Sequence, residues 1–288
     1  MKAGFVNIFG RPNAGKSTLL NLLMGEKLAI VSPKVQTTRH RIRGILNGND
    51  YQIILSDTPG IIDPRYKLHE KMMQAVKNSL EDADVAILLV DINDDWEACD
   101  HVFSSLDLKK PAIVVINKVD TAGAHRVKEA VVFFQEKPYC RLTLTVSALN
   151  SSDKEKVLNE ILQLLPEGEK FFEGDELSDL STRFFVGELI REKIYELFEK
   201  EIPYHAAVVV HEFKEAASLT RIRAEIIVQR ESQKGIILGE KGRMIKKLGM
   251  MARQEIERFL GHKVFLELFV KVREKWRERE DYLREFGY

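Results

Sequence analysis

The sequence predicts two domains: a doubly wound, mostly parallel α/β sheet, followed by a smaller α+β domain. Over residues 1–165, short apolar runs alternate with helical patterns, and a glycine-rich loop follows the first run. Beyond residue 181 the expected order becomes helix, two strands, two helices and a strand. A chain of 288 residues is long enough for each domain to bury its own core.

Six strands are expected in the first domain, which we place at residues 1–165. Most are near-continuous apolar runs, as is typical of strands buried on both faces. Asn47-Gly48-Asn49 has the composition of a hairpin turn, so one pair at the sheet edge should be antiparallel. The last helix should end just before Pro166. The expected strands are 5–9, 41–46, 52–56, 85–91, 112–117 and 142–146.

Residues 166–180 are predicted to be a linker, because they are acidic, contain two glycines and show no clear period. Phe171 and Phe172 are expected to dock on a neighbouring domain. The second domain, 181–288, should open with a helix to about residue 201 and include a helix that starts at Met250. Its middle strand should alternate between an apolar face and a face with Arg221, Arg223 and Glu225. A charged helix should close the chain.

Composition favours a reduced cytosolic protein. No apolar run is long enough to span a bilayer, and the N-terminus lacks a signal-peptide layout. The two cysteines, Cys99 and Cys140, form no metal-ligand pattern. Net charge is zero, but residues 181–288 hold 22 basic and 18 acidic residues. This small excess favours the second domain as the part that meets a polyanion.

Five short motifs, each at or after the end of an expected strand, indicate a guanine-nucleotide site. The first fits the G-x-x-x-x-G-K-[ST] spacing between a strand and a helix, which makes an incidental glycine turn a poor alternative. In order, they are Gly10-Arg11-Pro12-Asn13-Ala14-Gly15-Lys16-Ser17, Gln36-Thr37-Thr38-Arg39, Asp57-Thr58-Pro59-Gly60, Asn117-Lys118-Val119-Asp120 and Val146-Ser147-Ala148.

The phosphate end of the site follows from the first and third motifs. The glycines let the loop curl around phosphate oxygens, and the following helix turns its N-terminus toward them. Lys16 should meet the β- and γ-phosphates, and Ser17 should offer its hydroxyl to Mg²⁺. Asp57 should face the same ion through water, and the Gly60 amide should contact the γ-phosphate.

The fourth motif predicts the base. Guanine presents N1–H and N2–H side by side, and the Asp120 carboxylate can accept from both, whereas adenine has no such pair. Lys118 should lay its methylene stem along the base, and the Ala148 amide should donate to guanine O6. Nucleotide contacts are predicted for Gly10, Arg11, Pro12, Asn13, Ala14, Gly15, Lys16, Ser17, Thr18, Asp57, Thr58, Pro59, Gly60, Asn117, Lys118, Asp120, Ser147 and Ala148.

Together the motifs resemble the translation-factor-like class of Ras-type GTPases, and the C-terminal half narrows the match to the Era family. Residues 235–249, Gly-Ile-Ile-Leu-Gly-Glu-Lys-Gly-Arg-Met-Ile-Lys-Lys-Leu-Gly, look like the core of a type II KH domain. The stretches 36–42 and 270–277 are also Era-like. The resemblance implies a P-loop GTPase sheet followed by a KH domain.

The same resemblance implies a function. It implies GTP hydrolysis with Mg²⁺, binding near the 3′ end of 16S ribosomal RNA and assistance to 30S subunit assembly. It also implies loose peripheral contact with the inner membrane. By the family pattern the catalytic residues are Lys16, Thr38 and Gly60, and Mg²⁺ is held by Ser17, Thr38 and Asp57, with Thr37 as the alternative to Thr38. We expect a monomer without a stable protein partner.

Two positions depart from Ras. The residue after Gly60 is Ile61, which cannot orient a water as the Ras glutamine does, so intrinsic turnover should be slow, roughly 10⁻⁴ to 10⁻² s⁻¹. Related GTPases with asparagine at the position of Asn13 can hold K⁺, which would supply the charge of an arginine finger. A structural asparagine that only shapes the loop is an equally good interpretation.

The KH-like stretch predicts an RNA site. A Gly-x-x-Gly loop grips the backbone of about four unpaired nucleotides, and basic residues cluster around it here. Glu240 inside the loop should weaken the grip on phosphate. Salt-dependent binding is expected, with a log–log slope of about −0.7 per phosphate. The predicted RNA contacts are Ile236, Ile237, Gly239, Glu240, Lys241, Gly242, Arg243, Lys246 and Lys247.

Other interpretations remain at this stage. The KH-like domain would bind protein if the chain were a GTP-dependent membrane or cell-cycle adaptor. A tRNA-modifying GTPase is disfavoured because no catalytic cysteine motif is present, and the single phosphate loop excludes tandem GTPases. The final stretch, 271–284, would contact RNA or anionic lipid, or be a solvated charged helix.

Overall fold

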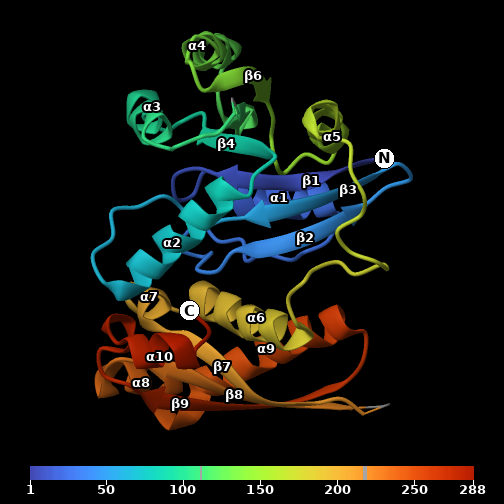
Figure 1. Cartoon of the computed structure of the whole chain (residues 1–288). Helices are drawn as coiled ribbons and strands as arrows, with labels where there is room; N and C mark the ends of the chain where they lie inside the picture. The colour runs from blue at the N-terminus through green and yellow to red at the C-terminus, as the bar shows by residue number, and fades with distance from the viewer. Residues whose placement is uncertain (111, 217–218) are drawn as a thin grey trace. The chain divides into compact units, whose positions relative to one another are not determined.

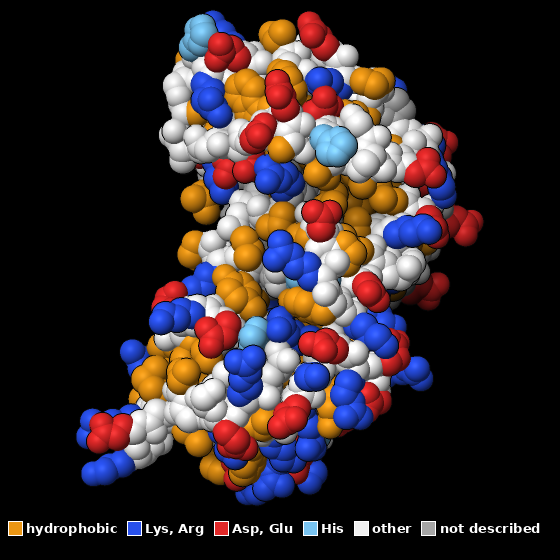
Figure 2. Space-filling view, turned by 90° about the vertical axis from the view of Figure 1, so that its left-hand side faces the viewer, with side chains coloured by type: hydrophobic (Ala, Val, Ile, Leu, Met, Phe, Trp, Pro, Cys, Tyr) orange, Lys and Arg blue, Asp and Glu red, His pale blue; other side chains and the backbone are white. Residues whose placement is uncertain are grey.

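The computed structural model describes residues 1–110, 112–216 and 219–288. The chain forms two compact units. Unit 1 comprises Met1–Pro64 and His69–Asp179, and unit 2 comprises Arg65–Leu68 and Leu180–Tyr288. On the face drawn in Figure 2, acidic and basic side chains are intermixed, in keeping with the zero net charge.

Unit 1 contains a six-stranded sheet in the order β2-β3-β1-β4-β5-β6 (Figure 1). All neighbours are parallel except β2 and β3, which form the expected antiparallel hairpin at the edge. The doubly wound, mostly parallel fold is therefore confirmed. The strands are β1 (Lys2–Phe9), β2 (Ile42–Asn47), β3 (Tyr51–Asp57), β4 (Val85–Asp91), β5 (Ala112–Asn117) and β6 (Cys140–Thr145).

The helices of unit 1 cover the sheet. Val76, Phe103 and Phe134, from α2, α3 and α4, share one core cluster with Leu88 and Val114 of the central strands. Helices α1 and α5 contact each other. The helices are α1 (Lys16–Met24), α2 (Lys67–Glu81), α3 (Trp96–Ser104), α4 (Ala124–Gln135) and α5 (Asp153–Leu164), with a short 3₁₀ turn η1 (Val119–Thr121).

The predicted linker lies along unit 1. The buried Gln52 side chain of β3 accepts from the Phe171 and Phe172 amides at 2.7 and 3.0 Å and donates to the Phe172 carbonyl at 2.9 Å. The amide of Ile45 in β2 donates to the Leu177 carbonyl at 2.9 Å. We call residues 166–179 the strap. It pairs with the polar backbone groups of the edge strand, which would otherwise be open to other chains.

Unit 2 contains a three-stranded sheet in the order β7-β8-β9, antiparallel between β7 and β8 and parallel between β8 and β9. Helices α6 and α9 pack on one face, where Ile190 and Ile256 meet Ala224 (Figure 1). This is the α+β arrangement expected of a KH domain. Its elements are α6 (Thr182–Leu197), α7 (Ile202–His205), β7 (Ala207–Lys214), β8 (Thr220–Val228), α8 (Glu231–Leu238), η2 (Glu240–Gly242), α9 (Arg243–Leu260), β9 (Val264–Val272), η3 (Trp276–Glu278) and α10 (Glu280–Glu285).

Two helix boundaries differ from expectation. Helix α9 starts at Arg243 rather than at Met250, because Gly249 lies inside the helix and does not break it. A Cβ on Gly249 would come within 3.7 Å of Leu268 of β9, so this glycine marks a close approach of helix to sheet. Helix α6 ends at Leu197, and the expected continuation to residue 201 is replaced by α7.

Candidate functional site

A cavity of about 370 Å³ in unit 1 brings all five motifs together. That volume is within the range of small-molecule sites. Of the predicted nucleotide residues, 12 line it: Pro12, Asn13, Gly15, Lys16, Ser17, Thr18, Gly60, Asn117, Lys118, Asp120, Ser147 and Ala148. The remaining six do not line the cavity. Asp57 is connected to it through its hydrogen bonds with Ser17 and Thr38, and the other five lie beside lining residues in the same motifs: Gly10, Arg11, Ala14, Thr58 and Pro59.

The phosphate loop closes around the Lys16 ammonium. Its Nζ donates to the carbonyls of Gly10 and Arg11 at 3.2 and 3.0 Å. Gly15 has φ 98°, and a Cβ there would lie 2.3 Å from Asn117 Nδ2, so only glycine fits. Burial lowers the pKa of Lys16 to about 8, although Asp57 opposes the shift. A buried ammonium whose hydrogen-bond partners are neutral carbonyl oxygens is suited to bind an anionic phosphate group.

Three oxygens converge beside this lysine. Ser17 Oγ lies 2.6 Å from Asp57 Oδ2 and 3.0 Å from Thr38 Oγ1, which in turn donates to Asp57 Oδ2 at 2.8 Å. Asp57 is fully buried, and its Oδ1 has no hydrogen-bond partner. Burial raises the pKa of Asp57, while Lys16, Ser17, Thr38 and Thr58 pull it down. Hydroxyl and carboxylate oxygens with an orphaned buried oxygen fit a hard cation such as Mg²⁺.

The base end of the cavity is organised by Asn117. Its Nδ2 donates to the Ala14 carbonyl at 2.9 Å, and its Oδ1 accepts from the Ala148 amide at 2.9 Å. Asn117 therefore ties the first, fourth and fifth motifs together. The Ala148 amide, expected to face guanine O6, is already bonded to Asn117 in this structure. Asp120 is exposed at the cavity wall, where its carboxylate is free to meet a base edge.

The structure also adds residues that the motifs did not include. Ile30, Val31, Ser32 and Pro33 form part of the cavity wall, although no chemical pattern marks them in the sequence. Asp153 accepts from the Ser147 amide at 2.8 Å and so shapes the fifth motif. An acidic residue at the start of a helix was the available signal.

Lys118 and Asn13 make further contacts around the phosphate loop. The Lys118 ammonium donates to Asp91 Oδ2 at 2.6 Å and to the Asn13 carbonyl at 2.9 Å, which leaves its stem to line the cavity. Asn13 has φ 65° and donates from Nδ2 to the Pro33 carbonyl at 2.9 Å. This contact joins the phosphate loop to the wall at residues 30–33.

In unit 2 the Gly-x-x-Gly loop is the short turn η2 between α8 and α9. Gly239 has φ 68°, and a Cβ there would lie 2.6 Å from Met244 Cγ. Gly242 has φ 76° and open space around it. Glu240, Lys241, Arg243, Lys246 and Lys247 are all exposed. The loop thus presents four cations and one carboxylate beside the N-terminus of α9.

One predicted RNA contact is corrected. Ile237 is fully buried in the core cluster with Leu248 and Ile226, so its side chain does not reach the surface. Ile236, one position earlier on α8, is 49% exposed and remains available. Consecutive helix residues point about 100° apart, which is why the two isoleucines cannot share one groove wall.

The expected charged helix at the C-terminus is also corrected. Helix α10 covers only Glu280–Glu285, and Trp276 is buried, with its indole nitrogen donating to the His205 carbonyl at 3.0 Å. The tryptophan is therefore a core residue of unit 2. Among the helices that the structure describes, none combines the length and apolar character needed to cross a bilayer.

Comparison with known proteins identifies the chain. Residues 5–118 match the family model "50S ribosome-binding GTPase", and residues 201–277 match "KH domain". The GTPase Era of Caldanaerobacter subterraneus subsp. tengcongensis is 42% identical over 100% of this chain and 98% of its own length. That of Geotalea uraniireducens is 44% identical, with the same coverage. The chain belongs to the Era family of GTPases.

Solved structures agree with this family assignment. A crystal structure of Era with MgGDPNP and nucleotides 1506–1542 of 16S ribosomal RNA has a TM-score of 0.96 and 42% identity. The matched region spans 100% of this chain and 99% of the crystallised Era chain. A tyrosine-to-alanine variant of Aquifex aeolicus Era, bound to GDP·AlF₄⁻, has a TM-score of 0.95 at 42% identity and the same coverage. The expected GTPase activity and Era-like fold are thus confirmed.

Proposed function

We propose that this GTPase is a nucleotide-controlled switch that binds the 3′ end of 16S ribosomal RNA and assists 30S subunit assembly. The observation that carries the proposal is the presence, in one chain, of a guanine-nucleotide cavity and an exposed, basic Gly-x-x-Gly loop. The Era relative crystallised with MgGDPNP and RNA nucleotides 1506–1542 supports both parts of the proposal.

We propose a role for each site residue, and the geometry of the cavity supports these roles. Ser17 and Thr38 would hold Mg²⁺ directly and Asp57 would hold it through water. The Thr38 hydroxyl, next to Ser17 and Asp57, favours Thr38 over Thr37. When bound, Mg²⁺ neutralises charge on the β- and γ-phosphates. Lys16 would bind those phosphates, the Gly60 amide would contact the last one, and Asp120 would select guanine.

Hydrolysis is expected to be slow without a partner. Ile61 follows Gly60 and is half-buried against the core cluster of α2 and α3. Its side chain is a hydrocarbon, so it has no group that could orient water. We propose that K⁺, held by Asn13, supplies positive charge at the phosphates. GTP turnover measured in KCl and in NaCl at equal ionic strength tests this; equal rates would exclude a role for K⁺.

RNA binding is tested with the RNA 1506–1542 and a scrambled RNA of equal length, in GDP and in a GTP analogue. Binding should weaken with salt, and a double variant Lys241→Ala/Lys246→Ala should weaken it further, because phosphate contacts are lost. The exposed pair Lys77 and Lys128 of unit 1, changed to alanine, is the matched control. Failure of the wild-type chain to prefer the ribosomal sequence would contradict the proposal.

The cellular location and the oligomeric state are part of the same proposal. We expect a cytoplasmic monomer that contacts the inner membrane only peripherally. Sedimentation with liposomes of anionic lipid, with and without RNA, separates this from the adaptor interpretation. Strong liposome binding without RNA binding would favour the adaptor.

A further inference from the structure

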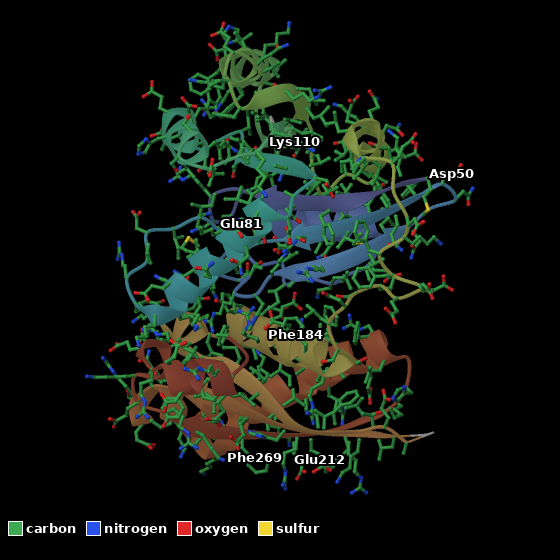
Figure 3. All side chains as sticks on the ribbon, viewed as in Figure 1. Asp50, Glu81, Lys110, Phe184, Glu212 and Phe269 are labelled. Carbon is green, nitrogen blue, oxygen red and sulfur yellow. The ribbon has the colours of Figure 1, made fainter. Side chains whose placement is uncertain are left out.

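The sheet of unit 2 has a second face, opposite to α6 and α9. Even-numbered residues of β8 and β9, such as Ala224 and Val264, enter the helix-covered core. Odd-numbered residues point the other way, and the strand register sets Arg221 beside Phe265 and Glu225 beside Phe269. Figure 3 shows Phe269 and Glu212 on the side of the sheet away from α6. We call this surface the open face.

Two phenylalanines on the open face are left in solvent. Phe265 is 50% exposed and Phe269 is 43% exposed. They lie four residues apart on one strand, or roughly 13 Å at 3.3 Å per residue. The Arg223 guanidinium carbon sits 5.3 Å from the Phe269 ring centroid. Aromatic rings on a rigid sheet, next to arginine, form the kind of platform on which unpaired bases stack.

Charge on the open face also favours a polyanion. Three acids occur there, but each is paired with a more exposed base. Lys271 is 47% exposed and its partner Glu225 only 14%. Lys214 is 73% exposed and its partner Glu212 34%. The third pair joins Arg223 and Glu267 at 3.7 Å. In each pair the base is the more exposed partner, by a wide margin for Lys271 and Lys214 and by a narrow one for Arg223, at 51% against 43% for Glu267.

We propose that the open face is a second RNA-binding surface, with Phe265 and Phe269 stacking on unpaired bases and Arg223 and Lys271 meeting phosphates. This inference rests on the proposed RNA-binding function. A Gly-x-x-Gly loop clamps about four nucleotides, whereas the RNA bound by the Era relative spans 1506–1542, so much of such an RNA lies beyond the loop. When one RNA molecule contacts both the loop and the open face, each contact raises the effective concentration of RNA at the other and so strengthens binding.

The test compares two RNAs: the 1506–1542 segment and a tetranucleotide from within it, which matches the length that the loop clamps. Phe269→Ala should weaken binding of the long RNA by about 5- to 100-fold, the range for loss of one stacking ring, and leave binding of the tetranucleotide within about twofold. Arg223→Gln should reduce the salt slope for the long RNA by about 0.7. Phe259 on α9 is a phenylalanine of similar exposure, 40%, so Phe259→Ala is the matched control and should leave the binding of both RNAs unchanged.

The outcomes separate this inference from the proposed function. Normal binding of the long RNA by Phe269→Ala, with both RNAs weakened by Lys241→Ala/Lys246→Ala, would overturn the second surface and leave the proposed function standing. If Phe269→Ala bound RNA normally but no longer co-sedimented with 30S particles, the open face would be a protein-binding surface, and the inference would also be overturned. Absence of binding of either RNA to the wild type would remove both proposals.

Discussion

At the scale of residues, the nucleotide cavity holds two buried charged groups whose pKa values are shifted in opposite directions by burial. Lys16 is shifted down and Asp57 up, so each is held in an environment that disfavours its charge. Their mutual attraction offsets the penalty only in part. A phosphate beside Lys16 and a cation beside Asp57 would each favour the charged form of its neighbour, which ties nucleotide and metal binding to protonation.

The first prediction concerns pH. Free Lys16 loses its proton as pH rises through about 8, whereas bound phosphate should hold the proton at higher pH. Binding in that window takes up a proton, so the Kd for GDP should rise with pH above about 8, approaching tenfold per unit. Titration calorimetry between pH 7 and 9 checks this. Lys16→Arg, which does not titrate, should lack the slope; an equal slope in both proteins would contradict it.

The second prediction concerns base selection. Asp120→Asn exchanges one acceptor for a donor, so guanine N2–H loses its partner while a carbonyl at purine C2 gains one. GTP affinity should fall by on the order of 10² to 10⁴, and xanthosine triphosphate should become the better ligand. Competition binding of GTP, xanthosine triphosphate and ATP checks both directions. Equal retention of GTP by the variant would show that Asp120 does not read the base.

The third prediction concerns the carboxylate inside the RNA loop. Glu240→Gln removes the one negative charge between Gly239 and Gly242, so affinity for the 1506–1542 RNA should rise about two- to fourfold, since exposed charge interactions are worth up to ~1 kcal/mol. Fluorescence anisotropy at two salt concentrations measures it. Glu231→Gln on α8, 78% exposed, is the control. A loss of affinity would mean that Glu240 contacts RNA favourably.

At the scale of elements, the β2–β3 hairpin carries the strap. Gln52 makes three hydrogen bonds to its phenylalanines, Phe171 packs edge-on against Phe5 with ring centroids 4.9 Å apart, and Arg43 pairs with Asp179 at 2.7 Å. Strand β2 directly follows the motif that contains Thr38. The strap is therefore held by the strand that leaves the nucleotide site.

The fourth prediction follows from this arrangement. Gln52→Ala leaves the strap amides of Phe171 and Phe172 without their acceptor, at a cost of roughly 1–3 kcal/mol. Hydrogen exchange should speed up over residues 167–179 while β4 and β5 stay protected. Asn47→Ala, which removes a neighbouring contact of Gln52 but no strap bond, is the control. Unchanged exchange in Gln52→Ala would show that other contacts hold the strap.

At the scale of the whole molecule, the chain consists of two units, each with its own core. The nucleotide cavity is lined only by residues of unit 1. A ligand that binds the folded form stabilises the unit that contains its site.

The fifth prediction is that GDP·Mg²⁺ at 100 times its Kd stabilises unit 1 by about 2.7 kcal/mol. A rise of roughly 5–11 °C in the melting temperature of unit 1 should follow, with unit 2 unchanged, because each 1 kcal/mol shifts a unit of this size by roughly 2–4 °C. Calorimetry with hydrogen exchange assigned to each unit measures this. Equal shifts in both units would show that the chain unfolds as one cooperative block.

Much of the fold was predictable because its signals are local. Buried parallel strands leave continuous apolar runs, hairpin turns leave Asn-Gly, and the phosphate loop needs glycine and lysine at set spacing. These rules act over a few residues, so the sheet, its antiparallel edge and the cavity motifs could be read in order along the chain.

Local patterns in the sequence therefore predict which residues form the candidate site, whereas the packing of distant segments determines which of those residues come into contact. Asn117 joins Ala14 to Ala148 across more than 100 residues, and no local pattern encodes such a clamp. Ile236 and Ile237 look alike in sequence, but packing buries one and exposes the other. Contacts between distant segments depend on how whole elements pack, and that information is spread over the entire core.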